Sequence, residues 1–523
     1  MKSLDEVDVV IVGSGAAGSL LAAKLSQAGR SVLILEGGPQ RVADDLYSSQ
    51  IWARRIHWTG PPTDTGGQDP ISVGFGSGWG TGGASLHHYG VWLRRHPDDF
   101  HMQTEFGKGL DWPMSYDDLR PFYDEIQQEI GLSGDAKAEV WRPAGDPYPM
   151  PPLEVFTQGK LIARGFDRAG LRISPLPMAI NSVPYGGRPA CLNDGWCDAG
   201  CPILALANPL AVYLPQAIKA GAVLQHESYV TRVLTDGSRS KALGVEYYLA
   251  SGEKQVQRAR IVIVAAYSFQ TPRILLNSAT SRYPNGLANG SGRVGSYMMS
   301  HATSNVFGLF SEETKSYQGR TGGQLLCQDA YAKDPEARGY VNSSQWLIAN
   351  ALKPNDLLGI VNSRPEIFGA ALATFMQRAA KHAATMTFVG EDLPRPENRL
   401  SLQHGKDQYG FPLAHVIHNF GSDDLACYNA GMKQGHSVFE AAGAQEVWHT
   451  GRVRMHAMGG AIMGSDPGTS VTNSYGQTHE VDNLFVAGPS LFPTSGAVNP
   501  NFTIHAVTLR TAKYILKHWR DFA

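Results

Sequence analysis

The sequence lacks several features that would place a protein in a specialised class. It has no apolar run of about 18 residues, so we expect no helix that crosses a bilayer. Its net charge of −2 provides no basic surface field for nucleic acid or for an anionic membrane. It has only five cysteines, an odd number that argues against a disulfide scaffold. These absences exclude a nucleic-acid-binding protein, a membrane-spanning protein and a small disulfide-rich protein.

The N-terminal segment also lacks the features of a secretory signal. It reads MKSLDEVDVVIVGSG, with one lysine, then acidic residues, then a strand-like run. A charged region, a separate apolar region and a cleavage site are all missing. We therefore expect the chain on its own to stay in the cytoplasm.

What the sequence does contain is typical of a large globular protein. Hydrophobic residues make up 42% and charged residues 18% of the 523 positions. This length corresponds to two to four domains of about 100–200 residues, or to two larger interleaved ones. The 58 glycines and 31 prolines predict many turns and close backbone approaches.

The N-terminus carries a complete βαβ pattern within about thirty residues. Residues 7–12 are mostly β-branched and apolar, as in a buried parallel strand. A glycine-rich turn follows at 13–18, then a predicted helix at 19–28 and a second strand at 31–35. Glu36 stands at the end of that strand. This context favours a dinucleotide site over a glycine turn that only packs a helix on a strand.

Each part of this pattern has a role in nucleotide binding. Gly13, Gly15 and Gly18 allow the backbone to approach a pyrophosphate, which faces the positive end of the helix dipole. The Glu36 carboxylate can accept hydrogen bonds from a ribose diol. FAD is favoured over NAD because the chain has no second nucleotide fingerprint, and because the loop with Gly82, Gly83 and Ser85 suits a flat ring system. Residues 483–488 are also typical of the closing strand of an FAD domain.

Further elements can be placed along the chain. A helix is predicted to begin after Ser115, with Asp118 completing a capping box, and to end at Gly131. Residues 141–153 hold five prolines and predict an extended connector. Short strands are predicted at 222–224, 230–234, 242–248, 261–266 and 484–487, and a closing helix at 503–518.

Several segments carry a resemblance to a known family. The N-terminal βαβ unit, GTGGAS, VIVAAYSFQTPRILL (262–276), HAMGGAIMG (456–464) and the ending at 483–510 resemble the glucose–methanol–choline (GMC) flavoprotein oxidoreductases. GLDWPMSYDDLRPFY, YPMPPL, GRPACLNDGWCDAGCP and RYPNGLANGSGRVG are similar to one branch, the catalytic subunits of bacterial FAD-dependent sugar dehydrogenases acting on glucose, fructose, sorbitol or gluconate.

The resemblance implies an α/β, two-domain GMC fold, in which a Rossmann-like FAD-binding domain adjoins a substrate domain built on a sheet. The FAD domain would span 1–300, with a connector and cysteine segment at about 141–205. The substrate domain would span 301–450, and 451–523 would return to the FAD domain. The same resemblance implies flavin contacts from His87, Val230, Gly488 and Asn499.

The sequence departs from the family pattern at three places. Tyr267 stands where a glycine is usual, and Pro489 follows Gly488 where an aspartate is common. The loop after Ser85 contains His87 and His88 in place of the usual His-Trp pair. His87 occupies the position at which some relatives bond the flavin covalently, although a histidine that only lines the site is the alternative we favour for this branch.

Alcohol oxidation requires a group that takes the hydroxyl proton while a hydride leaves for the flavin. Histidine suits this role because its ordinary pKa is about 6.5. The resemblance assigns the base to His456, in the pattern H-x-x-G-G, and its partner to Asn499. The alternatives are a structural histidine between glycines and a turn residue before Pro500. His505 is interpreted as a packing residue, and His301 matches a common histidine of the branch without an assigned role.

Three cysteines form the pattern Cys191-x5-Cys197-x3-Cys201. Thiolates this close together suit a soft metal, but zinc normally takes four ligands and no fourth Cys or His is near. A three-iron [3Fe-4S] cluster needs only three cysteines, and the resemblance implies such a cluster here, passing single electrons onward. Reduced buried thiols or a single disulfide remain the alternatives. Cys327 and Cys427 are interpreted as core thiols.

Three functions follow from these observations. The leading one is a dehydrogenase subunit that oxidises a sugar or polyol and passes electrons through the cysteines to an outside acceptor. The resemblance implies a multihaem cytochrome c subunit, and a small chaperone-like subunit whose signal would carry the chain to the periplasmic face of the membrane. The second is a free-standing sugar, glycoside or alcohol oxidase using oxygen or quinone. The third is a non-catalytic flavin or iron–sulfur protein, against which the matching catalytic motifs argue.

Overall fold

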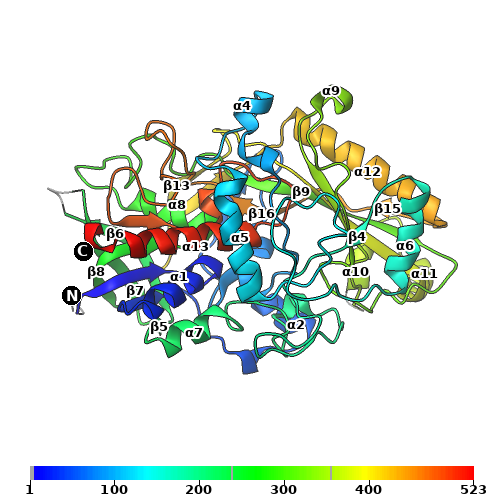
Figure 1. Ribbon diagram of the computed structural model, residues 1–523, viewed down its shortest axis with the longest axis horizontal. Helices are drawn as coiled ribbons and strands as arrows, with labels where there is room; N and C mark the ends of the chain where they lie inside the picture. The colour runs from blue at the N-terminus through cyan, green and yellow to red at the C-terminus, as the bar shows by residue number, and fades with distance from the viewer. Residues whose placement is uncertain (1–4, 237–239, 354–355, 523) are drawn as a thin grey trace.

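A computed structural model describes residues 5–236, 240–353 and 356–522. In Figure 1 a parallel sheet, together with both chain termini, occupies the left half of the molecule, and a second sheet occupies the right half. Helix α5 (Tyr116–Ile130) runs between them in this view. The two halves are built from interleaved segments, since the last residues of the chain return to the first sheet.

The first sheet is the nucleotide-binding type that the N-terminal pattern predicts. Its strands follow the order β5-β2-β1-β8-β7-β6, and β17 pairs with β8. The pairs β5–β2, β2–β1, β1–β8 and β8–β17 are parallel, whereas β6 and β7 extend the sheet in antiparallel fashion. The strands are β1 (Val7–Val12), β2 (Val32–Leu35), β5 (Val223–Gln225), β6 (Ser228–Thr235), β7 (Ala242–Leu249), β8 (Lys254–Val264) and β17 (Leu484–Val486).

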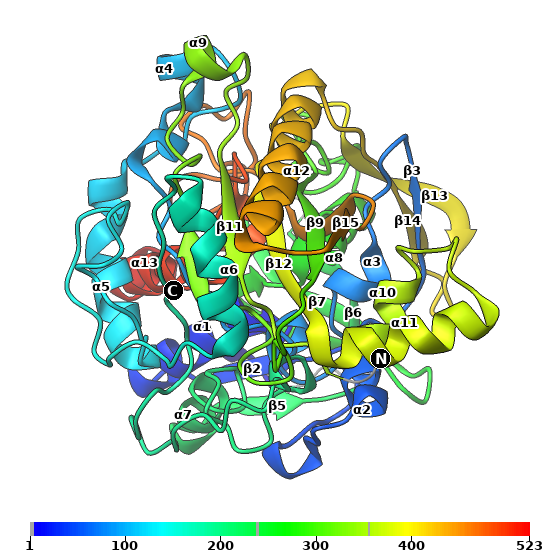
Figure 2. The ribbon, with the colours of Figure 1, turned by 90° about the vertical axis from the view of Figure 1, so that its right-hand side faces the viewer.

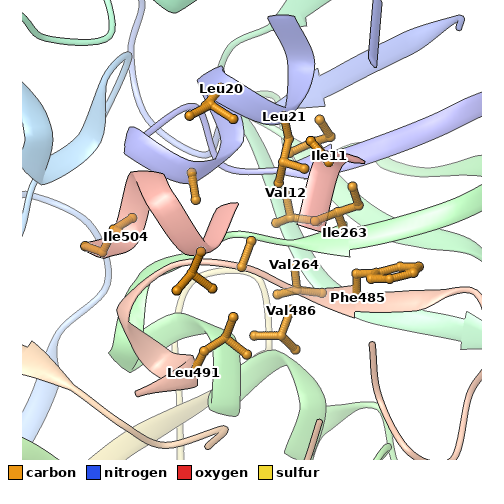
Figure 3. Close-up of a cluster of buried hydrophobic side chains, with 14 of the residues drawn as sticks. Ile11, Val12, Leu20, Leu21, Ile263, Val264, Phe485, Val486, Leu491 and Ile504 are labelled. Atoms are coloured by element: carbon orange, nitrogen blue, oxygen red, sulfur yellow. The ribbon is translucent and has the colours of Figure 1, made fainter. Parts of the chain in front are cut away.

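Helices bury the apolar faces of this sheet. Helix α1 contacts α7 and α13, and α13 in turn contacts α5. These helices are α1 (Ala16–Gln27), α7 (Tyr213–Lys219) and α13 (Asn501–Lys517). Figure 3 shows part of this cluster, in which Leu21 of α1 lies beside Ile11 of β1, and side chains of β8 and β17 such as Ile263 and Val486 lie beyond. Burial of this cluster fixes the first turn of α1 against the carboxyl end of β1.

The second sheet is antiparallel, in the order β15-β9-β12-β11-β10-β4, with β16 also pairing with β9. In Figure 2, α12 (Ser422–Ala442) and α6 (Thr157–Arg168) cover the face of this sheet turned toward the viewer, and α10 (Asp356–Val361) and α11 (Gly369–His382) lie below them. The strands are β4 (Ser174–Pro175), β9 (Met299–Leu309), β10 (Leu325–Cys327), β11 (Ser344–Ile348), β12 (Ala383–Gly390), β15 (Glu446–His449) and β16 (Val453–Met458).

A small third sheet joins distant parts of the chain. Its order is β13-β14-β3, with β14 and β3 parallel. Its strands are β3 (Thr63–Gly66), β13 (Arg399–Lys406) and β14 (Pro412–Ile417), and α8 (Tyr267–Asn277) packs between it and β6. The remaining short helices are α2 (Gln50–Arg55), α3 (Val73–Gly76), α4 (Met102–Phe106), α9 (Pro335–Arg338) and α14 (Trp519–Phe522). Among the described residues, no helix combines the length and apolar character needed to cross a membrane.

The predicted α/β class, with a parallel nucleotide-binding sheet and a second sheet, is found, with local differences at element ends. Helix α1 begins at Ala16 and not at 19, because the glycine-rich turn passes directly into the helix. Strand β8 begins at Lys254 and not at 261, because its first half pairs with β7. The capping box of Ser115 with Asp118 is confirmed. The predicted domain boundaries stay predictions; β4, from the connector segment, pairs with β10 of the second sheet.

Candidate active site

A cavity of about 1180 Å³ runs from the first βα turn to the second sheet. Most of the residues that the sequence assigns to the site line it, although they come from widely separated segments. Those lining residues are Gly13, Gly15, Glu36, Gly83, Ser85, His87, Val230, His456, Gly488 and Asn499. Gly18 and Gly82 do not line the cavity but support the loops that do.

The glycine-rich turn after β1 is shaped for close backbone approach. Gly13 has φ +99°, and a Cβ atom there would lie 2.7 Å from the Ala265 carbonyl oxygen. A Cβ atom at Gly18 would lie 2.0 Å from the Gly13 carbonyl oxygen, so only glycine allows α1 to pack here. No side chain caps the N-terminus of α1, and its first turn carries no acid. This helix end therefore fits the pyrophosphate of a dinucleotide.

Glu36 is buried beside this turn and organises two loops. Its Oε2 accepts hydrogen bonds from the Ser14 N–H at 3.0 Å and the Ser14 hydroxyl at 2.7 Å. Its Oε1 accepts from the Gly38 N–H at 2.9 Å. The Gly82 N–H in turn donates to the Ser14 hydroxyl oxygen at 3.1 Å, which explains the role of Gly82 behind the cavity wall. A carboxylate has about four lone-pair positions, so Glu36 keeps one for the ribose that the sequence predicts it binds.

Two backbone positions near the predicted flavin site adopt unusual conformations. Tyr267, which stands where the family has glycine, has φ +64° at the start of α8. A hydrogen bond from its hydroxyl to the Gly76 carbonyl oxygen, at 3.1 Å, helps to hold the ring at the cavity wall. Gly488 has φ +103° and ψ −167°, a region that is essentially restricted to glycine. At position 267, where glycine is usual in the family that the sequence resembles, the backbone is left-handed, and in this chain a tyrosine adopts that conformation.

His87 lines the cavity and is buried, with its Nε2 atom lacking a hydrogen-bond partner. Its ring centroid lies 4.2 Å from that of His57. Burial, and secondarily the neighbouring His57, lowers the pKa of His87 to about 3. The ring is therefore neutral, and its Nε2 is a buried polar atom without a partner beside the cavity.

The predicted catalytic pair, His456 and Asn499, meets at the wall of the same cavity. His456 lies in a β-bulge of β16, where the pairing with β9 shifts between Met455 and Met458, and its φ is +64°. Such bulges redirect side chains, and this one directs the imidazole into the cavity. His456 Nε2 lies 3.5 Å from Asn499 Nδ2. Residues 43 positions apart in the sequence are thus brought together as the motifs predict.

The surroundings of His456 suit a base. Burial lowers the pKa of His456 to about 4, so the ring is neutral near pH 7. A neutral imidazole can accept a proton from a hydroxyl placed beside it. The 3.5 Å between Nε2 and Nδ2 lets a substrate hydroxyl contact both groups, accepting a hydrogen bond from Asn499 while donating one to His456.

Sequence reasoning missed two neighbours of this pair. His301 on β9 places its Nδ1 2.9 Å from His456 Nδ1, and Gln345 on β11 donates from Nε2 to Asn499 Oδ1 at 3.4 Å. His301 matches a common histidine of the branch, but its contact with His456 depends on the pairing of β9 with β16. No local motif marks Gln345. His505 packs as predicted, with its ring centroid 4.5 Å from that of Trp92.

The three cysteines at 191, 197 and 201 are all free thiols, packed against one apolar cluster. The Asn193 N–H donates to Cys191 Sγ at 3.3 Å, and the Leu206 N–H donates to Cys201 Sγ at 3.4 Å. Burial raises the pKa of each of the three thiols. Cys327 and Cys427 are buried within another hydrophobic cluster, as the interpretation of them as core thiols expects.

The part of the chain that the structure describes holds no group of three or more His, Cys, Asp or Glu side chains arranged to hold a metal ion. The cluster at the three cysteines therefore stays a prediction from the sequence.

Comparison with known proteins identifies the family. Two models described as GMC oxidoreductase match this chain, one over residues 7–303 and the other over residues 394–508. These matches cover both the glycine-rich turn after β1 and the predicted catalytic pair.

Relatives match along almost the whole chain. The 2-methyl-1,2-propanediol dehydrogenase of Mycolicibacterium austroafricanum is 32% identical, over 99% of this chain and 97% of its own. The fructose dehydrogenase large subunit of Gluconobacter japonicus is 30% identical, over 97% of each chain. The crystal structure of pyridoxine 4-oxidase from Mesorbium loti is 17% identical with a TM-score of 0.66, covering 98% of this chain and all of that one, and it shares the fold. The chain belongs to the GMC oxidoreductase family, the FAD-dependent enzymes that act on hydroxyl groups of alcohols and sugars.

Proposed function

We propose that this enzyme oxidises a hydroxyl group of a neutral sugar or polyol to a carbonyl. The observation that carries the proposal is the pair of His456 and Asn499, whose facing nitrogens lie 3.5 Å apart at the wall of the large cavity. FAD supplies the acceptor for the hydride when it is bound. The residues of this chain orient the hydroxyl group and remove its proton.

In the proposed reaction, the Asn499 side-chain amide donates a hydrogen bond to the substrate hydroxyl oxygen. The hydroxyl proton points toward His456 Nε2, which accepts it as the C–H bond is cleaved. The proton is thus held on the imidazole, and two electrons leave the substrate with the hydride. Because the pKa of His456 lies at about 4, the imidazole starts the reaction neutral.

The wall next to the catalytic pair supports a neutral, polyhydroxylated substrate. The three strands β9, β11 and β12, all within the described residues, place no charged side chain on the cavity surface. Strands β9 and β12, with Asn350 two residues beyond the end of β11, instead present hydroxyl and amide groups, from Thr303, Ser304, Asn305, Asn350, Thr385 and Thr387. Such groups can replace the hydrogen bonds that sugar hydroxyls make to water. A carboxylate substrate would find no cation on these three strands; the cations that line the same cavity, Arg54 and Lys353, come from other segments, and Lys353 is already paired with Asp198 and Asp356.

We further propose that electrons leave through an iron–sulfur cluster held by Cys191, Cys197 and Cys201. The support is chemical: Cys191 and Cys201 accept backbone N–H donors, and the buried Arg320 interacts electrostatically with Cys191 and Cys197. Arg320 keeps two guanidinium nitrogens, Nε and Nη2, without hydrogen-bond partners. Burial lowers its pKa only to about 10, so it stays positive and suits an anionic group. The outside acceptor would be a redox partner such as the cytochrome c subunit that the branch resemblance implies, with the small subunit as its companion.

The substrate proposal can be tested with two compounds that share a carbon skeleton. Sorbitol and gluconate differ at one terminal group, which is a neutral alcohol in the first and a carboxylate in the second. The FAD-loaded enzyme is mixed anaerobically with each compound. Sorbitol or another neutral polyol is expected to bleach the flavin with a second-order rate constant roughly 10-fold or more above that of the matching acid. If neutral sugars and polyols all fail to bleach it, the proposal is wrong.

The relay proposal is tested separately by iron and acid-labile sulfide per FAD in protein purified without oxygen. We expect about three irons per flavin, and loss of that iron in Cys197→Ser. Cys427→Ser, which changes a buried thiol outside the segment, is the matched control and should keep its iron. Flavin without iron in the anaerobic wild-type protein would contradict the relay and favour the second function, an oxidase, which oxygen consumption then tests.

A further inference from the structure

The proposed base has a histidine directly behind it. His301 is fully buried on β9, and its Nδ1 lies 2.9 Å from His456 Nδ1. On its other side, His301 Nε2 lies 2.9 Å from the carbonyl oxygen of Gly496. A carbonyl oxygen only accepts hydrogen bonds, so His301 Nε2 must carry its hydrogen. In a neutral ring this leaves Nδ1 of His301 as an acceptor.

The partner amide is fixed from the opposite side by a second chain of contacts. Gln345 Nε2 donates to Asn499 Oδ1 at 3.4 Å, and Gln328 Nε2 donates to Gln345 Oε1 at 2.9 Å. Both glutamines are buried. With its oxygen engaged in this way, Asn499 turns its Nδ2 group, which can only donate, toward His456.

His456 therefore has a fixed acceptor behind it and a fixed donor in front. One tautomer satisfies both neighbours, with a hydrogen on Nδ1 donated to His301 and a lone pair on Nε2. The other tautomer would set two lone pairs face to face at His301 and two N–H donors face to face at Asn499. Only the first can take a proton from a substrate hydroxyl.

We propose that His301 is a positioning residue, which uses the Gly496 carbonyl to hold His456 in the Nδ1–H tautomer and leaves Nε2 as the proton acceptor. The inference rests on the proposed function, in which His456 is the base. It explains why a histidine occupies a fully buried position on β9 and why its ring is kept neutral: burial and the facing His456 and Arg95 lower its pKa well below the ordinary value. His301 acts on the substrate only through His456.

Two substitutions separate this role from simple packing. In His301→Gln the amide can still donate to the Gly496 carbonyl and accept from His456 Nδ1, whereas His301→Leu removes both groups. We expect flavin reduction by substrate to fall roughly 100-fold in His301→Leu and to recover to within about 5-fold of wild type in His301→Gln. Flavin content and thermal stability verify that each variant folds. Equal losses in the two variants would overturn the proposal.

The tautomer itself can be read without turnover. In the substrate-free holoenzyme labelled with ¹⁵N-histidine, the resonances missing from His456→Gln identify the His456 ring. We expect its Nδ1 to be protonated and its Nε2 to carry the lone pair, and a protonated Nε2 would overturn the inference. This measurement needs no substrate and stands even if His301→Leu does not fold. Failure of every alcohol to reduce the flavin would contradict the proposed function, while the NMR result would still decide the tautomer.

Discussion

At the scale of single residues, the proposed chemistry depends on a histidine whose charge is set by burial. His456 has a pKa of about 4, below the ordinary value near 6.5, because the folded protein removes its ring from water. The same burial explains the neutral state of His301 behind it. A base of this kind is ready at neutral pH and is lost only in acid.

The first prediction concerns this acid limb. Anaerobic flavin reduction by substrate should stay level from neutral pH downward and fall only as His456 becomes protonated at a pH of about 4. Stopped-flow measurement across this range, with retained flavin absorbance as a control for unfolding, gives the profile. A limb centred near 6.5 would show that the base is solvated or is another histidine.

A second prediction changes the partner of the base. Asn499→Asp places a carboxylate where Nδ2 now lies 3.5 Å from His456 Nε2. An opposite charge at this distance favours the imidazolium, so the pKa of His456 should rise by about 1–3 units. The acid limb of flavin reduction should move upward by a similar amount. An unmoved limb with unchanged rate would mean that Asn499 does not face the base.

Residues of this site were predictable where their motifs are contiguous. His456 lies within HAMGG and Asn499 next to Pro500, and both reach the cavity. The contacts of His301 and Gln345 depend on strand pairings of the second sheet, between β9 and β16 and between β11 and β12. Such pairings bring together residues far apart in the sequence, so no local pattern reveals them.

At the scale of elements, local signals identify the elements of the first βαβ unit and the start of α5, although α1 begins three residues before its predicted start. The run of β-branched residues, the glycines and the Ser115 capping box each act within a few residues, and each is found where expected. The left-handed backbone of Tyr267 is the exception. Its sequence neighbours carry no signal for φ +64°, and the family comparison alone, with its usual glycine, pointed to this position.

The third prediction tests a strained turn against a matched control. Gly488→Ala forces a side chain into backbone angles of φ +103° and ψ −167° at the cavity wall, and should destabilise the protein by about 1–3 kcal/mol. Gly443 has a similar φ of +96° at the exposed C-terminus of α12, with open space around it. Both alanine variants should melt at lower temperature, but only Gly488→Ala should also weaken FAD retention. Equal FAD retention in the two would place Gly488 away from the cofactor.

At the scale of the whole molecule, buried histidines link stability to pH. Burial lowers the pKa of His87 to about 3 and those of His88, His456 and His505 to about 4. In the unfolded chain these histidines take up protons near pH 6.5. The stability that the four buried neutral rings contribute is therefore complete above that pH. It is lost as the pH falls toward the folded values. Glu139 and Asp424, whose pKa values are raised to about 7 by burial, act in the opposite direction and offset part of this effect.

The fourth prediction follows from that balance. The melting temperature of the holoenzyme should fall between pH 7 and pH 5, because these four histidines and His301, whose pKa is lowered in the same direction, outweigh the two carboxyl groups. Calorimetry at several pH values measures the slope, and His505→Gln, which removes one of these histidines away from the catalytic pair, should reduce it. A melting temperature that rises toward acid pH would contradict the assigned balance.

Which parts of the fold could be predicted depends on how far apart in the sequence the contacting segments lie. The parallel sheet could be predicted because β1, α1 and β2 are consecutive and strongly patterned. The second sheet could be expected only from family resemblance, since β4 near residue 174 joins strands beyond residue 299. Its polar inner wall, on which the proposed substrate class rests, combines residues from β9 and β12 with Asn350, and these show no common motif.

The most direct test of the central claim is the rate of flavin reduction by a neutral polyol in His456→Ala, measured anaerobically by stopped flow. His449→Ala, which removes an exposed histidine on β15, serves as the control. We predict that reduction falls roughly 100-fold or more in His456→Ala and is unchanged in the control. A fall of less than about tenfold, equivalent to about 1.4 kcal/mol, would contradict the assignment of His456 as the base.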